Sequence, residues 1–477
     1  MTDRPNILFI FTDQQRPDWL GSHADIPVRT PHLDALAARG VHLTNAVCPS
    51  PVCAPTRACI TAGNEYDRCG VLGNNTLYPS RQPPYQRRLR DEAGYHVMGC
   101  GKFHTGRSGS DGYFDWGLKG DERCEEWGFS SARFNAGKNQ AVLLARSAGQ
   151  PRDRYMAYLQ QKGLMQIHID DYARRFADDV WTATFATTLP DEAYFDNWIT
   201  RNGLALLEEA PEDQPWYLEV NYQNPHHPWD ITERMHALYR NPDVDFPPPE
   251  HCDLDTTPTE HAQVRRNYAA MIEHLDECVG QLLAKLSARG ELERTLIVFS
   301  SDHGEQLGDY GQWQKLTPLQ ASLGVPFIAA GPGVMAQAAN PALVSLIDLH
   351  ATFLECAGLD VPNDIDSRSL THLLSGGHQT HRRVVYSGLS AWRLAYDGRY
   401  KYIVGYDPQK RHGDQFEKMA VSAQETLRLQ AERPAILFDT QRDEYTNIID
   451  DEADITGYLR ANLEADILSQ IQHRTQK

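Results

Sequence analysis

The stretch of sequence that decides the fold is residues 264–305, which joins three patterns in one run. It begins with VRRNYAAMIEHLDECVGQLLAKL at 264–286, where apolar side chains recur at helical spacing, and Gly290 follows its end. The apolar pentapeptide LIVFS then occupies 296–300, and the polar pentapeptide SDHGE occupies 301–305. A long amphipathic helix that leads into a short buried strand is typical of a crossover connection in a parallel sheet. We therefore expect a crossover helix over Val264–Leu286 and a parallel strand over Leu296–Ser300.

Other apolar runs of strand length lie on both sides of this unit and alternate with amphipathic stretches. They are Ile7–Phe11, His96–Gly99, Trp216–Asn221 and Pro326–Ala330. This alternation predicts an α/β fold, with a mixed, mostly parallel sheet flanked by helices.

The last hundred residues have a different pattern, which predicts a small antiparallel α+β domain. Its expected elements are strands at Val384–Tyr386, Ala391–Tyr396 and Tyr400–Val404, a hairpin turn at Asp397-Gly398 and a helix over Gly457–Gln472. We therefore divide the chain into a larger α/β domain at 1–377 and a small domain at 378–477. Within the larger domain, residues 106–190 are Gly-rich at first and show little periodicity. They predict an insertion that shapes a substrate pocket.

Composition and charge limit the partners and the location. The chain has 477 residues, with 46 Lys and Arg against 64 Asp and Glu, a net charge of −18. The electrostatic field of this negative charge repels nucleic acid, anionic membranes and highly charged anionic polymers. We therefore expect neither nucleic-acid nor membrane partners. No apolar run approaches the roughly 18 residues of a membrane span. The N-terminus does not resemble a secretory leader and the nine cysteines form no CxxC pair, which together predict a reducing, cytoplasmic location.

Polar clusters follow four of the expected strands. In an open α/β sheet, ligands bind beyond the carboxyl ends of the strands, so these clusters should converge. Each cluster taken alone has a purely structural interpretation, such as a helix cap, a solvated lysine or a buried histidine. The clusters are Asp13-Gln14, Gly101-Lys102-Phe103-His104, Asn224-Pro225-His226-His227-Pro228 and Ser301-Asp302-His303-Gly304-Glu305.

Asp13, Gln14, Asp302 and His303 together offer oxygen ligands and one imidazole. Such a set suits one divalent cation of hard to borderline character, and it fits calcium, manganese or magnesium. A structural zinc site would need cysteines or more histidines beside these residues.

The most specific motif is Cys53-Ala54-Pro55-Thr56-Arg57. This Cys-x-Pro-x-Arg pattern resembles the signature of the type I, formylglycine-dependent sulfatases of the alkaline phosphatase-like superfamily. In that family a maturation enzyme converts the cysteine to formylglycine (3-oxoalanine). The polar clusters at 101–104, 225–228 and 301–305, and Lys315 after them, are similar to further family elements in the same chain order. Gln14 and His303 resemble the branch that contains phosphonate monoester hydrolases and choline sulfatases.

The resemblance implies an alkaline-phosphatase-like fold and a sulfuric ester hydrolase. It implies that hydrated formylglycine at position 53 attacks sulfur to give a covalent sulfated enzyme, which then releases inorganic sulfate, while an alcohol leaves. The implied catalytic residues are Cys53, Arg57, Lys102, His104, His226 and Lys315. The implied metal ligands, with calcium favoured over manganese or magnesium, are Asp13, Gln14, Cys53, Asp302 and His303.

Two other functions stay open. One is a phosphonate monoester or phosphodiester hydrolase with the same site, and the other is a catalytically silent metal-binding protein of this fold.

The implied partners are a small sulfate ester and a formylglycine-generating maturation enzyme, and a homo-oligomer stays open. The sequence does not show whether the ester is an aryl, alkyl, choline or sugar sulfate. We expect the insertion, with Trp127 as a candidate, and the segment after Lys315 to contact the leaving group.

Overall fold

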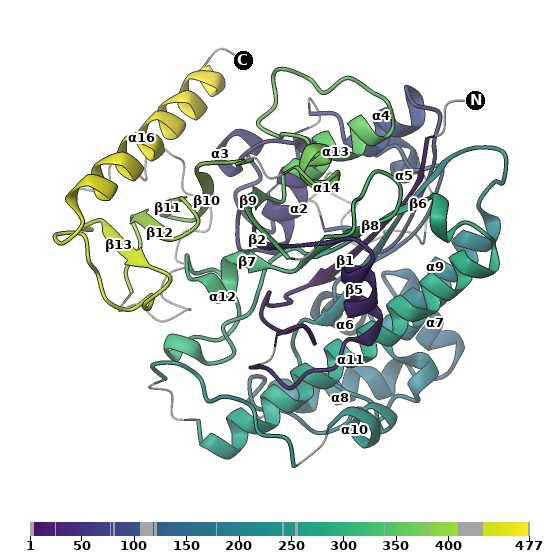
Figure 1. The fold of residues 1–477 in the computed structure, drawn as a ribbon. Coiled ribbons are helices and arrows are strands. Elements are labelled where there is room, and N and C mark those ends of the chain that lie inside the picture. Colours follow the sequence, from purple (N-terminus) through teal and green to yellow (C-terminus); the bar gives the residue numbers. More distant parts are fainter. Residues whose placement is uncertain are drawn as a thin grey trace.

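The computed structural model describes residues 4–23, 25–76, 78–79, 82–104, 118, 122–177, 179–240, 243–252, 256–337, 339–377, 380–408 and 433–475. These residues form a nine-stranded sheet with helices on both faces, and a four-stranded sheet beside the C-terminal helix α16 (Figure 1). Among them, no helix combines the length and hydropathy that crossing a membrane requires.

The large sheet is mixed and mostly parallel, as predicted. Its strand order is β4-β3-β5-β1-β6-β8-β2-β7, and β9 pairs with β2. Antiparallel pairing is confined to β8 with β6 and β2, and to β7 with β2. The strands are β1 Asn6–Asp13, β2 Val41–Val47, β3 His96–Lys102, β4 Ser131–Asn135, β5 Trp216–Pro225, β6 Thr295–Ser301, β7 Gly324–Val325, β8 Phe327–Ala330 and β9 Asn340–Ser345.

All five strands predicted for this sheet are confirmed, whereas β2, β4, β7 and β9 were not predicted. In β2 an exposed Thr44 and a half-buried Asn45 interrupt the apolar run. The predicted crossover helix is α11, Pro258–Ala288, which begins six residues earlier than expected. Its start is stabilised by a capping box, in which Thr257 and Glu260 satisfy each other's backbone N–H groups.

The remaining helices connect and cover the strands. They are α1 Pro31–Ala38, α2 Cys53–Ala62, α3 Tyr66–Cys69, α4 Tyr85–Asp91, α5 Glu122–Glu126, α6 Lys138–Ala148, α7 Arg154–Gln161, α8 Met165–Ala177, α9 Phe195–Glu209, α10 Glu233–Tyr239, α12 Gln320–Leu323, α13 Asp348–Cys356, α14 Thr371–Leu374 and α16 Ala453–Thr475, with short 3₁₀ helices at Asp191–Ala193, Leu292–Arg294 and Asp309–Gly311.

Alternate residues of β1 belong to two different hydrophobic clusters. Phe9 and Phe11 pack in a cluster that includes α2, α4 and α13, whereas Leu8 and Ile10 pack in one that includes α9 and α11. Both faces of the strand are therefore buried, which explains why it reads as a continuous apolar run.

The C-terminal residues form an antiparallel sheet in the order β10-β11-β12-β13, as predicted for the first three strands and the hairpin. Its strands are β10 Val385–Leu389, β11 Trp392–Tyr396, β12 Tyr400–Val404 and β13 Ile436–Asp439. Leu389 and Leu394 join the cluster under α2, while Leu459 and Leu463 of α16 pack against the other face. The domain boundary at residue 377 stays a prediction.

The predicted insertion at 106–190 contains ordered structure. Its Gly-rich part, Gly106–Gly120, lies outside the described residues apart from Leu118. The rest holds α5 to α8 and the strand β4, which pairs with β3 and extends the large sheet at one edge. This segment is therefore tied directly to the sheet that carries the site.

Candidate active site

The polar clusters converge because their strands end at the same edge of the sheet. Thr12 of β1 pairs with Ser301 of β6, and Gly101 of β3 pairs with Asn221 of β5. Gly101 has a φ of 96°, and a Cβ atom there would lie 1.9 Å from the carbonyl oxygen of Asn221. Only glycine allows this close approach, which brings the next residue, Lys102, to the site.

Helix α2 presents residue 53 from its first turn. Cys53 is the first helical residue, after Val52 in an extended conformation. Pro55 fits this turn because a backbone N–H there would have no partner within the helix. Arg57 lies four residues after Cys53 and therefore on the same face of the helix. The motif thus has a local structural reason as well as a chemical one.

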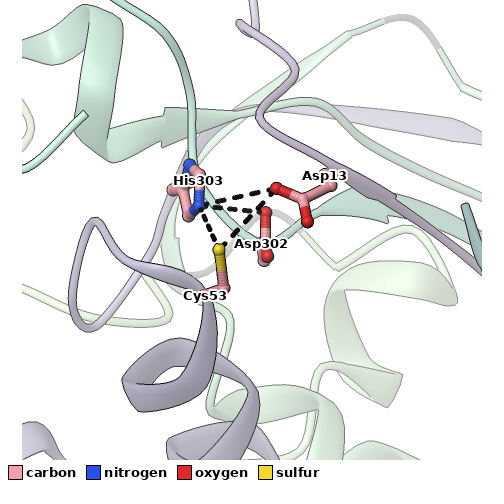
Figure 2. A group of neighbouring side chains, drawn as sticks. All are labelled: Asp13, Cys53, Asp302 and His303. Carbon is pink, nitrogen blue, oxygen red and sulfur yellow. Dashed lines mark hydrogen bonds and ion pairs between the residues drawn. The ribbon is translucent and has the colours of Figure 1, made fainter. Parts of the chain in front are cut away.

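Asp13, Cys53, Asp302 and His303 form a buried cluster, whose ligand atoms all lie within 4.8 Å of one another. Figure 2 shows the four side chains pointing toward one another from α2 and from the ends of two strands. Sγ of Cys53 lies 3.3 Å from Nε2 of His303 and 3.8 Å from Oδ1 of Asp13. Nε2 of His303 lies 3.5 Å from Oδ1 of Asp302.

The donors of this cluster fit a divalent cation. Nδ1 of His303 lies 3.0 Å from the carbonyl oxygen of Gly304, which can only accept, so Nδ1 carries a proton and Nε2 faces the carboxylates. Burial alone would lower the pKa of His303, but the neighbouring Asp302 raises it above its usual value. A cation bound beside Asp302 would take the place of the proton on Nε2. Burial and the neighbouring Asp13 raise the pKa of Asp302, because two ionised carboxylates at this distance repel each other. A cation between them would remove that repulsion, and oxygen and imidazole donors suit calcium, manganese or magnesium. The structure therefore contains a buried metal-like site.

Arg57 links the cluster to two other strands. Its Nε donates to Oδ2 of Asp302 at 2.9 Å. Its Nη1 donates to the carbonyl oxygen of Lys102 at 2.9 Å and to Oδ1 of Asn221 at 2.7 Å. The guanidinium therefore holds the ends of β3, β5 and β6 in one arrangement around position 53.

Lys102 supplies a second positive charge to the cluster. Its Nζ forms an ion pair with Asp13 and lies 3.4 Å from Sγ of Cys53. Burial alone would raise the pKa of Asp13, but Lys102, Arg57 and Lys315 hold it well below its usual range. Burial and Asp13 would likewise raise the pKa of the Cys53 thiol, but Lys102 and other nearby cationic groups bring it well below the usual value. Position 53 thus lies in a strongly anion-stabilising field.

Lys315 approaches the cluster from the loop after β6. Its Nζ donates to Oε1 of Gln14 and lies 2.9 Å from Nε2 of His226. Burial and Lys315 lower the pKa of His226 well below its usual value, so its ring is neutral and accepts from the ammonium. The backbone N–H of Gln14 donates to Asp302 at 3.1 Å, while its carboxamide oxygen faces Lys315. The predicted metal-ligand role of Gln14 stays a prediction.

These groups face one cavity. We call Cys53, Lys102, His104, His226 and Lys315 its charged end; Nε2 of His104 lies 3.2 Å from the carbonyl oxygen of Asn74. Five carboxamide side chains line the same cavity and form what we call the amide wall. They are Asn74, Asn139, Gln140, Gln223 and Gln314.

The predicted insertion contributes to the cavity through the start of α6, residues 137–140, and the segment after Lys315 contributes Leu316. Trp127 does not belong to the described lining; it packs against Tyr78, with ring centroids 4.9 Å apart. Asn139 is therefore a candidate that the described lining offers within the insertion, and the role of Trp127 stays a prediction. His227 also lines the cavity, and its Nε2 lies 3.3 Å from Nδ2 of Asn139.

The sequence did not reveal several of these residues. Asn221 had a signal, since it is a polar residue at the end of a buried strand, and it proves to orient Arg57. Asn74 and Asn139 lie on segments with no motif, and they reach the cavity only through tertiary packing.

The arrangement suits the transfer of a small anionic group. Residue 53 supplies a reactive side chain, the carboxylates and His303 can hold a cation, and Lys102 and Lys315 can neutralise charge on a bound anion.

Comparison with known proteins gives a consistent result. The family model described as Sulfatase matches residues 5–359. A choline-sulfatase of Rhizobium meliloti (strain 1021) is 30% identical over 443 residues, which cover 86% of this chain and 80% of the relative. An arylsulfatase of Clostridium perfringens is 25% identical over 415 residues, covering 80% of this chain and 81% of the relative.

Solved structures share the fold. A phosphonate monoester hydrolase from Silicibacter pomeroyi aligns with a TM-score of 0.74 at 22% identity, over 99% of this chain and 95% of its own. A protein solved with its substrate D-glucosamine-2-N,6-O-disulfate aligns with a TM-score of 0.71 at 19% identity, over 99% and 98% of the two chains.

Proposed function

This chain belongs to the sulfatase family and is a sulfuric ester hydrolase, and we propose that it cleaves small sulfate monoesters into inorganic sulfate and an alcohol, with residue 53 as the nucleophile. The observation that carries the proposal is the position of Cys53, which lies in the cluster with Asp13, Asp302 and His303 and 3.4 Å from Nζ of Lys102. A nucleophile in this field can approach an anionic ester, because the neighbouring positive charges offset the repulsion.

We propose that Cys53 acts in its formylglycine form. The hydrated aldehyde supplies one hydroxyl to attack sulfur and a second hydroxyl from which sulfate is later expelled as the aldehyde re-forms. In this proposal Asp302 takes the proton of the attacking hydroxyl, and His104 takes the proton of the second. Arg57 and Lys102 hold residue 53 and the carboxylates in place.

Lys315 and His226 would bind the ester oxygens at the charged end. The neutral His226 ring accepts from Lys315 in the structure, so the pair can share one proton. When the sulfur–oxygen bond to the alcohol breaks, this pair can protonate the leaving oxygen.

One divalent cation, which we propose to be calcium, would be held by Asp13, Gln14, Asp302, His303 and residue 53. Bound there, it would act as a Lewis acid on the sulfate oxygens. The buried carboxylates and Nε2 of His303, which faces them, support this part of the proposal.

For the leaving group we propose a hydroxylated alcohol, such as a sugar. Carboxamides both donate and accept hydrogen bonds, which matches hydroxyl groups. One end of the Asn139 carboxamide contacts His227, and its Oδ1 atom is buried without a partner among the described residues. The described lining has no Phe, Tyr or Trp ring to stack on an aryl group or to surround a quaternary ammonium.

A maturation enzyme that converts Cys53 is part of the proposal, as is a cytoplasmic location. The location is supported by the nine cysteines, all of which are free thiols in the structure.

Two measurements test the function. Mass spectrometry of the peptide that contains residue 53, from protein made with a maturation enzyme, should show formylglycine. The matured protein should then hydrolyse sulfate esters faster than the matched phosphate and phosphonate esters. Unmodified cysteine in a fully active preparation would disprove the nucleophile, and a preference for phosphonate monoesters would favour the alternative hydrolase.

A further inference from the structure

Glu305 is a buried carboxylate beside the site that the proposed reaction does not use. It is fully buried and lies two residues after the metal-like cluster. Its Oε1 accepts from the backbone N–H groups of Leu307, at 3.0 Å, and Gln314, at 2.6 Å. Its Oε2 accepts from Nε2 of Gln14. One side chain therefore touches both ends of a loop and a residue of the site.

The loop that Glu305 closes is the one that carries Lys315. Four of its non-glycine residues have a left-handed φ, namely Leu307 (51°), Tyr310 (55°), Gln314 (69°) and Leu316 (88°). Such conformations are costly and persist only where surrounding contacts impose them. The backbone N–H groups that Glu305 accepts from belong to two of these strained residues.

The same carboxylate acts together with Lys315 to orient the Gln14 carboxamide, whose Nε2 also lies 3.4 Å from Nδ1 of His227. With Nε2 directed at Glu305, Oε1 faces Lys315 and accepts from its Nζ. A flipped carboxamide would place an oxygen against the Glu305 carboxylate and an NH₂ group against an ammonium. Both contacts would then be repulsive, so this network allows one orientation only.

We propose that Glu305 is a positioning residue for the sulfate-binding lysine. It sets the Gln14 carboxamide and the loop backbone together, and through them it holds Nζ of Lys315 at the charged end of the cavity. The requirement is for an acceptor at position 305 facing a donor at position 14.

The polarity of that contact provides the test. Glu305→Gln keeps the shape and can still accept from the loop, but it places an NH₂ group against the NH₂ group of Gln14. Gln14→Glu places two carboxylates together. The double variant reverses the polarity, because the carboxamide introduced at position 305 then donates to the carboxylate introduced at position 14. The other oxygen of that new carboxylate still accepts from Lys315.

The four proteins, all matured, are compared by kcat/KM on 4-nitrophenyl sulfate and by the affinity for inorganic sulfate in calorimetry. Each single variant should lose about 10- to 100-fold in both quantities, as is typical when a group that orients a site residue is removed. The double variant should recover most of the loss. Glu273→Gln is the matched control, since Glu273 is a buried carboxylate that accepts from the backbone N–H and the guanidinium of Arg29, remote from the cavity.

The proposal is overturned if Glu305→Gln keeps both wild-type values, or if the double variant is no better than Gln14→Glu. If Glu305→Gln alone does not fold, the comparison of Gln14→Glu with the double variant still decides. If the wild type cleaves no sulfate ester, the proposed function fails, but the sulfate affinities still test the role of Glu305.

Discussion

The two parts of the cavity are built in different ways. At the charged end, Cys53, Lys102 and Lys315 are each 5% exposed or less, and each contacts a side chain from a distant segment. Most side chains of the amide wall are half-buried, and they come from a loop, the start of α6 and the segment before Lys315. A fixed arrangement of charges suits one repeated chemical step, whereas partly exposed carboxamides on separate segments suit recognition of one alcohol. Substitutions at the charged end should therefore lower kcat/KM for all esters, whereas substitutions in the amide wall should affect only some of them.

The largest effect is expected at residue 53. Cys53→Ala removes the nucleophile, so kcat should fall by more than about 1,000-fold for every ester tested. Steady-state kinetics on a panel of aryl, alkyl, choline and sugar sulfates measures it. Cys59→Ala is the control, since Cys59 is buried in the same helix but packs in the hydrophobic cluster. If the Cys53→Ala variant still hydrolyses the esters, residue 53 is not the nucleophile.

The next effect concerns the cation. Asp302→Asn should release the metal and lower kcat/KM by about 100-fold or more, since losing a ligand costs at least as much as losing a group that orients one. Elemental analysis and kinetics with added calcium or manganese measure both losses. Asp276→Asn is the matched control, because Asp276 is a buried carboxylate that caps backbone N–H groups of α1. Retained metal with full activity would show that Asp302 is not a ligand.

At Lys315 the expected effect is smaller but uniform. Lys315→Met removes a charge that contacts the sulfate, so kcat/KM should fall by about 100-fold, or ~3 kcal/mol, for all esters. The order in which the esters are preferred should not change, and the same kinetic panel reports it. Lys285→Met, at a surface ion pair with Glu208, serves as the control. If kcat/KM falls for esters of one leaving group only, Lys315 contacts the leaving group, as the amide wall does, and not the sulfate.

The smallest effect should be selective. Asn139→Ala removes a carboxamide from the wall, so sugar sulfates should lose about 1–2 kcal/mol in kcat/KM while 4-nitrophenyl sulfate loses little. Asn462→Ala, on the exposed face of α16, is the control. If Asn139→Ala slows every ester equally while its melting temperature is unchanged, the proposed boundary between the two parts is wrong.

How much could be predicted differs between these parts for a physical reason. All five residues of the charged end were named from the sequence, but on two different grounds. Lys102, His104 and His226 were expected together because parallel strands bring the residues at their carboxyl ends to one edge whatever the loops do. Cys53 and Lys315 were implied only by the resemblance to the sulfatase family. The motifs that these residues form are also specific, since few other kinds of site combine them. The amide wall was not predicted, since a carboxamide carries no periodicity and is common on any surface. Trp127, named from its aromatic character, lies outside the described lining, because aromatic character does not tell which face of a loop a ring occupies.

The sequence by itself determined the α/β architecture, the five predicted strands of the large sheet, the crossover helix and the residues around position 53. These features depend on local periodicity and on motifs, both of which can be read along the chain. Only the tertiary structure decided that β4 completes the edge of the sheet, that Asn139 faces the cavity and that Glu305 orients Gln14. The last contact joins residues 291 positions apart. It depends on the register of β1 against β6 and on the course of a strained loop, neither of which has a sequence period.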